Sequence, residues 1–196
     1  MMEECPSGRR SALGRRVYAR SVPRVRIPPL PNFFMEHLAF HLAQNGIALT
    51  CFANEFSLSK IRLSHHDKEI LPKIYDRSFK ELAFDFFSYF GGKNVDFVKY
   101  MSLIPFEMFS DFQKKVYDFL VRNICFGNFI TYGKLASLLF AKNYSRAVGI
   151  VLKINPFPVI IPCHRVVPAN FSPENIGGFN QGLNIKRKLL EIENII

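Results

Sequence analysis

Several features that mark membrane, secreted and metal-binding proteins are missing from this chain of 196 residues. No run of 18 apolar residues occurs, so we expect no membrane-spanning helix. No apolar run follows the basic N-terminus in the manner of a secretory signal. The cysteines form no C-x-x-C pair, which argues against a disulfide framework and a zinc cluster. These absences predict a protein of the reducing cell interior, cytoplasmic or, in a eukaryote, nuclear.

Positive charge is distributed unevenly along the chain. Residues 1–30 hold seven Arg and two Glu, and residues 31–104 hold eight basic and eight acidic side chains. Residues 105–196 hold eleven basic and six acidic ones. A neutral middle followed by a basic C-terminal part favours contact with a polyanion, most simply nucleic acid. The charge pattern alone is equally consistent with a solvated basic surface.

The chain divides into three segments by composition. Residues 1–32 are rich in Arg and Pro and show neither a helical nor a strand period, so we expect a disordered or extraneous basic extension, with Met35 as a candidate true start. Residues 33–104 alternate short apolar runs with polar turns, which predicts a small α/β domain. Residues 105–196 are predicted to form a second, mostly α domain. An apolar share of 48% is sufficient for real cores.

Within the middle segment, residues 47–53 read as a strand and residues 78–89 as a helix. Residues 96–104 would link the two domains. The run Ser64-His65-His66-Asp67 invites a metal site, but it has no spaced partner ligands, and a polar loop explains it equally well. We therefore predict no bound metal ion.

The C-terminal segment predicts three helices in its first fifty residues. Ser110 and Gln113 form a capping-box pattern at the start of the first, and Gly127 supplies its stop. The second helix is short and would turn its leucines inward: Leu135, Leu138 and Leu139. The third runs from Ser145 to about Lys153 after a polar turn. Two short helices joined by a tight turn in a basic segment suit a helix-turn-helix, although generic helix pairs are common.

The candidate nucleophile is Cys163, which stands between Pro162 and His164 after an apolar run that we interpret as a short strand. A thiol with an ordinary pKa of about 8.5 is mostly protonated at neutral pH, so it needs a neighbouring base or cation to attack. His164 can serve as that base where the strand breaks or through a bridging water, because adjacent strand residues point to opposite faces. Taken alone, a Cys-His pair beside an apolar run is more often ordinary packing.

The surrounding motifs, in order and spacing, resemble those of the methylated-DNA–protein-cysteine methyltransferases, which repair 6-O-alkylguanine. The resemblance is dense over residues 108–194 and weak over residues 35–104. It rests on Phe112-Gln113-x-x-Val116, Ile130-Thr131-Tyr132-Gly133-x-Leu135-Ala136, Ser145-Arg146-Ala147-Val148-Gly149, Asn155-Pro156-x-Pro158, Pro162-Cys163-His164-Arg165-Val166-Val167 and Gly182-Leu183-x-x-Lys186-x-x-Leu189-Leu190-x-x-Glu193.

The resemblance implies an irreversible, single-turnover transfer of the alkyl group from guanine, and by extension from 4-O-methylthymine, to Cys163 without a cofactor. His164 would remove the thiol proton through a water, and Glu193 would orient the imidazole. Tyr132 would donate a hydrogen bond to the leaving guanine. Asn155 would be the hinge that ties the recognition helix to the active-site strand. Arg165 is expected to be a structural ion-pair partner.

The resemblance also implies a partner and a fold. The partner would be double-stranded DNA containing alkylated guanine, with the base flipped into the protein and Arg146 filling the vacated stack. Ser145, Ala147 and Tyr132 would also lie against the DNA. The implied fold is a ribonuclease H-like α/β domain followed by a helix-turn-helix, winged-helix-like domain. We expect a monomer with no obligate protein partner.

The implied substrate pocket includes Val166, Phe179, Asn180 and Pro158, with the carbonyls of Cys163 and Val166 reading the guanine amino group. Phe179 stands where the family usually has tyrosine, so it can stack on the base but offers no hydroxyl. This departure predicts a different tolerance for bulky alkyl groups. The cysteines and histidines that hold zinc in some members have no counterpart here.

Three other classes of protein compete with this interpretation. A non-catalytic alkylguanine-binding protein would flip the lesion but lack the acceptor thiol, and Cys163 argues against it. An alkylation-sensing transcription regulator would use the basic helix pair but would not need Tyr132, His164 and Glu193 together. A cysteine hydrolase would need a glycine-rich nucleophile turn, which the sequence does not show.

Overall fold

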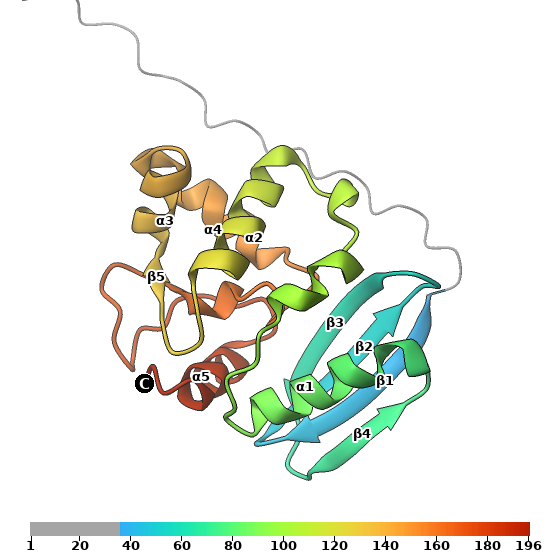
Figure 1. The fold of residues 1–196 in the computed structure, drawn as a ribbon. Helices are drawn as coiled ribbons and strands as arrows, with labels where there is room; N and C mark the ends of the chain where they lie inside the picture. The colour runs from blue at the N-terminus through green and yellow to red at the C-terminus, as the bar shows by residue number, and fades with distance from the viewer. Residues whose placement is uncertain (1–35) are drawn as a thin grey trace, which may run out of the picture.

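The computed structural model describes residues 36–196, so the basic extension expected over residues 1–32 lies outside the described residues. A four-stranded sheet with one covering helix forms the first part, and short helices form the second (Figure 1). We call residues 37–90 the sheet domain and residues 111–192 the helical domain. No helix in residues 36–196 is long and apolar enough to cross a membrane.

The sheet is antiparallel throughout, in the order β3-β2-β1-β4. Its strands are β1 (His37–Gln44), β2 (Ile47–Ala53), β3 (Leu58–His65) and β4 (Ile70–Ile74). A two-residue turn joins β1 to β2, and both of its residues, Asn45 and Gly46, have positive φ, as the tight hairpins of twisted sheets require. The strand predicted over residues 47–53 is confirmed as β2. Strand β3 lies at the edge of the sheet that faces the helical domain (Figure 1).

Helix α1 (Lys80–Phe90) crosses one face of the sheet and confirms the helix predicted over residues 78–89. A short 3₁₀ turn, η1 (Arg77–Phe79), precedes it, and Asp76 caps that turn through its side chain. The inner face of α1 carries apolar and aromatic side chains that are fully buried against the sheet, including Phe86 and Phe90. Burial of rings of this size supplies much of the stability of a small sheet.

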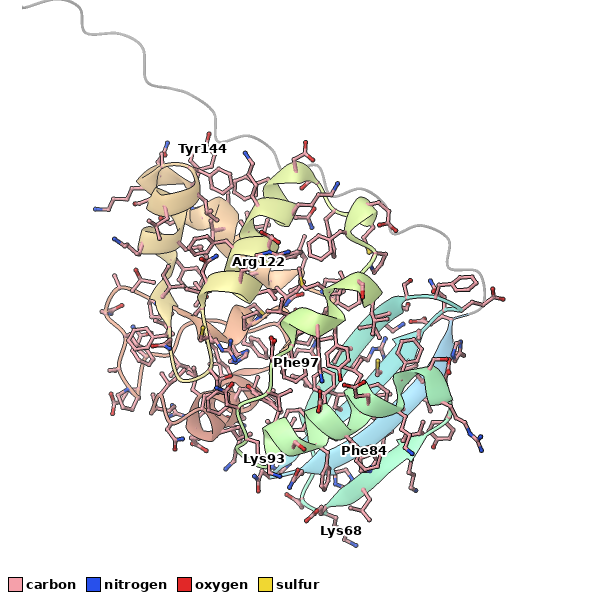
Figure 2. All side chains as sticks on the ribbon, viewed as in Figure 1. Lys68, Phe84, Lys93, Phe97, Arg122 and Tyr144 are labelled. Carbon is pink, nitrogen blue, oxygen red and sulfur yellow. The ribbon has the colours of Figure 1, made fainter. Side chains whose placement is uncertain are left out.

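The segment that follows α1 is anchored to the core by buried side chains, among them Phe97 and Tyr100. It forms the 3₁₀ turns η2 (Val98–Leu103) and η3 (Phe106–Met108). Phe97 lies between α1 and the helical domain in Figure 2, with its ring 4.9 Å from that of Phe86 and 5.6 Å from that of Tyr89. One continuous apolar core therefore runs from the sheet domain into the helical domain.

The helical domain consists of four helices, two short paired strands and two 3₁₀ turns. They are α2 (Asp111–Asn123), β5 (Ile130–Thr131), α3 (Tyr132–Leu139), η4 (Lys142–Tyr144), α4 (Ser145–Lys153), η5 (Cys163–Arg165), β6 (Val166–Val167) and α5 (Leu183–Ile192). Strands β5 and β6 pair in parallel. Tyr144 marks the end of this domain farthest from the sheet, and Lys68 marks the opposite end of the molecule (Figure 2).

Helix predictions in this domain are mostly confirmed. The capping box of Ser110 and Gln113 is present, and α4 begins and ends at the predicted residues. The predicted stop was wrong, because α2 ends at Asn123 and Gly127 lies in the turn beyond it with φ of 77°. The inward position of Leu138 was also wrong: its side chain is 53% exposed, because so short a helix buries only the stripe that includes Leu135 and its neighbour.

Candidate active site

The apolar run before Cys163 is a turn, so the short strand expected there was wrong. Val159 adopts a left-handed φ of 77°, and the amide of Ile161 donates to the carbonyl of Phe157 at 2.9 Å. The side chain of Asn155 accepts from the Phe157 amide at 2.9 Å, which replaces a strand partner. Prolines on both sides of Phe157 cannot donate to a ladder. The chain then enters η5, which begins at Cys163.

Asn155 connects the end of α4 to the cysteine. It is buried, and its Nδ2 donates to the carbonyl of Ile161 at 3.0 Å and to Cys163 Sγ at 3.1 Å. An amide donor on the sulfur stabilises a thiolate more than a thiol. The structure thus places the predicted hinge residue in direct contact with the candidate nucleophile.

His164 and Glu193 form a buried pair behind Cys163. His164 Nε2 lies 2.8 Å from Glu193 Oε1, and neither side chain is accessible to solvent. Glu193 follows the last turn of α5 and does not fray, because it is 1% exposed. A carboxylate only accepts, so Nε2 carries the proton and donates. The other ring nitrogen, Nδ1, is buried without a hydrogen-bond partner among the described residues.

Glu193 is bound from several directions. Arg165 donates from Nε to Oε2 at 2.8 Å and from Nη2 to Oε1 at 2.9 Å, which confirms Arg165 as an ion-pair partner. The Gly127 amide donates to Oε2 at 3.3 Å, and the Tyr89 hydroxyl donates to Oε1 at 2.6 Å. Arg165 also donates to the carbonyl of Ile124 at 2.6 Å. The carboxylate is therefore fully satisfied although it is buried.

Burial sets the protonation states of the reacting groups. It lowers the pKa of His164, which outweighs the pull of Glu193 and keeps the imidazole neutral. Burial opposes ionisation of Glu193, yet His164 and Arg165 hold its pKa well below the usual range. Burial raises the pKa of Cys163 to about 11, against the opposing effects of Asn155 and Lys186. A thiol with that pKa is ionised at pH 7 in roughly one molecule in ten thousand. The resting pair is therefore a thiol and a neutral imidazole.

Lys186 is a charged group near the site to which the sequence assigned no role. It is fully buried on α5, and its Nζ donates to the carbonyl of Val166 at 2.7 Å and to that of Gly178 at 3.3 Å. Burial lowers its pKa to about 8. The helical period could have revealed it, because Lys186 stands on the same face as the buried Leu189 and Leu190.

A pocket of about 300 Å³ opens in front of Cys163. This volume is at the small end of the range for ligand sites. Residues from α3, α4 and the loop before α5 surround it: Tyr132, Gly149, Leu152, Lys153, Cys163, Gly178, Phe179 and Asn180. A flat organic group in this pocket would therefore contact aromatic rings, backbone atoms and one sulfur atom.

The structure brings only some of the predicted pocket residues to this space. Tyr132, Phe179 and Asn180 line it together with Cys163. The side chains of Val166 and Pro158 are buried and do not line it. The carbonyl of Val166 is already bound by a lysine in this structure.

The helix pair α3–α4 presents one exposed arginine, on the helix that contributes Gly149 and Leu152 to the pocket. Arg146 is exposed near the start of α4, whereas the Ala147 side chain is 2% exposed and faces the core. Ala147 therefore cannot offer its side chain to a partner, because the amphipathic pattern of α4 turns it inward. Ser145 is half-buried and donates from Oγ to the carbonyl of Lys142 at 2.6 Å, closing the turn between the helices.

The metal alternative for the polar loop after β3 finds no support in residues 36–196. His65 Nε2 lies 3.5 Å from Asp67 Oδ1, and both side chains are largely exposed. No three His, Cys, Asp or Glu side chains in this part of the chain come together as a metal site would require.

Comparisons with known proteins identify relatives of this chain. Residues 111–195 match the family model described as 6-O-methylguanine DNA methyltransferase, DNA binding domain. A methylated-DNA–protein-cysteine methyltransferase of Thermococcus sibiricus is 36% identical over 136 residues, which is 69% of this chain and 67% of the relative.

Two solved structures share the fold. The O6-methylguanine-DNA methyltransferase of Pyrococcus kodakaraensis strain KOD1 superposes with a TM-score of 0.63 at 27% identity, over 80% of this chain and 99% of the other. Mycobacterium tuberculosis OGT in complex with DNA gives a TM-score of 0.60 at 26% identity, over 79% of this chain and 91% of that one. The arrangement of a sheet domain and a helical domain is thus common to these proteins.

Proposed function

The chain belongs to the methylated-DNA–protein-cysteine methyltransferase family, and on that premise we propose that it repairs DNA by moving a methyl or larger alkyl group from O6 of guanine to its own Cys163. One observation carries the proposal. Cys163 lies between a pocket that is open to solvent and a buried His164–Glu193 pair that can take a proton. A structural cysteine would need neither.

The proposed reaction is a single displacement. As the Sγ–carbon bond of Cys163 forms, the bond between that carbon and guanine O6 breaks, and its electron pair stays on the base. The thiol proton passes to His164 Nδ1 through one water molecule, and Glu193 stabilises the imidazolium through Nε2. The thioether is stable, so each molecule acts once and no cofactor takes part. The high pKa of the resting thiol agrees with such a reaction. A protonated Cys163 is protected from other electrophiles until a substrate arrives.

Tyr132 supports departure of the guanine. It stands at the first position of α3 and lines the pocket with Cys163. Burial and the nearby sulfur raise the pKa of Tyr132, so its hydroxyl remains a proton donor at neutral pH. A donor aimed at the base stabilises the charge that develops there. Phe179 provides a stacking surface in the same pocket.

DNA binding is the second part of the proposal. The helices α3 and α4 would act as a helix-turn-helix, with the exposed Arg146 filling the space that the flipped base leaves. The relative from M. tuberculosis was solved in complex with DNA, which supports duplex DNA as the partner. Binding would rest on phosphate contacts and would therefore weaken with salt.

Finer features of the proposal follow the family. The sheet domain would be ribonuclease H-like and the helical domain winged-helix-like, with boundaries at residues 33–104 and 105–196. The protein would act as a monomer on 6-O-alkylguanine and on 4-O-methylthymine.

Peptide mass spectrometry tests the proposal. The protein is mixed with duplex DNA that contains one 6-O-methylguanine, and the tryptic peptide of residues 154–165 is measured. We expect one methyl group on Cys163, saturating at one per molecule.

The exposed Cys125 offers a matched control, since a Cys125→Ala variant should accept the methyl group as the wild type does. Lesion binding without methylation would instead identify a recognition protein, and absence of binding would favour the regulator. Methylation of Cys125 at the same rate as Cys163 would show that the reaction is unselective.

A further inference from the structure

Tyr89 reaches the reactive pair from the other domain. It belongs to α1, at the end of the helix that covers the sheet, and its side chain is 0% exposed. Its hydroxyl donates to Glu193 Oε1 at 2.6 Å and lies 3.3 Å from His164 Nε2. The sheet domain therefore contributes a polar atom to a site whose other members all come from the helical part of the chain.

Packing alone explains the ring of Tyr89 but not its hydroxyl. The ring meets those of Phe97 and Phe126 edge-on at 5.6 and 5.9 Å, which a phenylalanine could do equally well. A buried hydroxyl is costly unless it is bonded, and this one is placed on the oxygen that already accepts from His164. Tyr89 thus shares Glu193 Oε1 with His164 and with Arg165.

We propose that Tyr89 is a positioning residue for alkyl transfer, which uses its hydroxyl to occupy Glu193 Oε1 and so keeps His164 neutral, with Nδ1 free to receive the thiol proton. This inference rests on the proposed function. It assigns the sheet domain a part in the chemistry, in addition to its part in stability.

The direction of the effect follows from the charges around the pair. His164 faces Glu193, Arg165 and Lys186, and of these only the carboxylate favours an imidazolium. A hydrogen bond from Tyr89 withdraws part of that carboxylate's acceptor strength. Burial and Glu193 raise the pKa of Tyr89 well above its usual value, so the hydroxyl is a donor throughout the working pH range. Removing it should strengthen the bond from His164 to Glu193 and favour the imidazolium.

The test is the Tyr89→Phe variant, compared with wild type and with Tyr100→Phe. Tyr100 is a matched control, because its hydroxyl also donates to a carboxylate, Asp85 Oδ2 at 2.7 Å, within the sheet domain and its connection. Single-turnover methyl transfer from duplex DNA with one 6-O-methylguanine is measured from pH 5 to pH 9. We expect the acid limb of the profile to move up by at least about half a pH unit in Tyr89→Phe. Tyr100→Phe should leave it unchanged.

NMR titration of His164 in the same variants gives a second readout that needs no transfer. An acid limb and a His164 titration that coincide with wild type in Tyr89→Phe would overturn the inference, even if the rate falls. If wild type transfers no methyl group at all, the proposed function fails, whereas the His164 titration still tests the contact. Should Tyr89→Phe fail to fold, 3-fluorotyrosine at position 89 replaces it, because it is a stronger donor of nearly the same shape. The pH profile of transfer and the His164 titration should then both move to lower pH, and unmoved curves would contradict the inference.

Discussion

The two sides of Cys163 differ in their exposure to solvent. Behind the sulfur, His164, Glu193, Arg165 and Tyr89 are at most 7% exposed, and each charge meets a partner. In front of it, the pocket opens to solvent, and Arg146 is exposed on α4, the helix that lines the pocket through Gly149. The groups proposed to move a proton are thus held in a buried network, and the arginine proposed to contact DNA stays hydrated.

This difference has an energetic consequence. A buried, hydrogen-bonded ion pair contributes to stability only while both partners are present, since a lone buried charge costs several kcal/mol. An exposed arginine contributes almost nothing to stability and can be changed at little cost. Substitutions behind Cys163 should therefore affect both folding and chemistry, whereas a substitution of the exposed Arg146 should affect recognition alone.

Cys163→Ala should have the largest effect, because it removes the bond-forming atom. We expect methyl transfer to be lost completely, while affinity for DNA stays within about twofold of wild type, since binding rests on phosphate contacts. Mass spectrometry and a gel-shift titration at fixed salt measure the two quantities. A parallel loss of DNA affinity would show that the two sides of the cysteine are not independent.

Glu193→Ala should have the next largest effect. It leaves Arg165 buried without its carboxylate and His164 without its acceptor. The free energy of unfolding should fall by about 3–5 kcal/mol, and transfer should fall with it. Urea denaturation followed by circular dichroism measures the change. The neighbouring Glu191→Ala is the control, because Glu191 is exposed and its ion pair within residues 36–196 is with the exposed Lys188, so its loss should cost less than about 1 kcal/mol.

Acid should destabilise the wild type through the same pair. The folded-state pKa values of His164 and Glu193 both lie below their ordinary values of 6.5 and 4.5, so the unfolded chain binds protons more readily. Their contribution to stability is therefore complete above pH 6.5 and is lost as pH falls, first through His164 and then through Glu193. We expect a loss on the order of 2 kcal/mol between pH 7 and pH 4. Urea midpoints at several pH values measure it, and midpoints that do not change between pH 7 and pH 4 would contradict it.

Arg146→Ala should have the smallest effect and tests the outer side. Repair of duplex DNA should slow roughly tenfold, which corresponds to about 1.4 kcal/mol of lost support for base flipping. Transfer from free 6-O-methylguanine should change less than about twofold. Stability should not change. Arg77→Ala removes the same charge from an exposed position in the sheet domain and controls for total charge. Equal losses on duplex and free base would refute the flipping role.

Local signals in the sequence predicted the elements that depend on neighbours in the chain. The capping box at Ser110 and the extent of α4 follow from contacts a few residues apart, and both are confirmed. The errors arose where tertiary packing overrides a local pattern. The run before Cys163 reads as a strand but has no partner strand, because Asn155 and two prolines turn it back on itself.

The sequence by itself determined the family and the candidate site of Cys163, His164 and Glu193, because short motifs with fixed spacing carry them. It also determined that a basic helix pair precedes them. Only the tertiary structure decided that Tyr89 bonds to Glu193, 104 residues away. The physical reason is that hydrogen bonds between distant segments depend on how two domains pack together, and no local period records that packing.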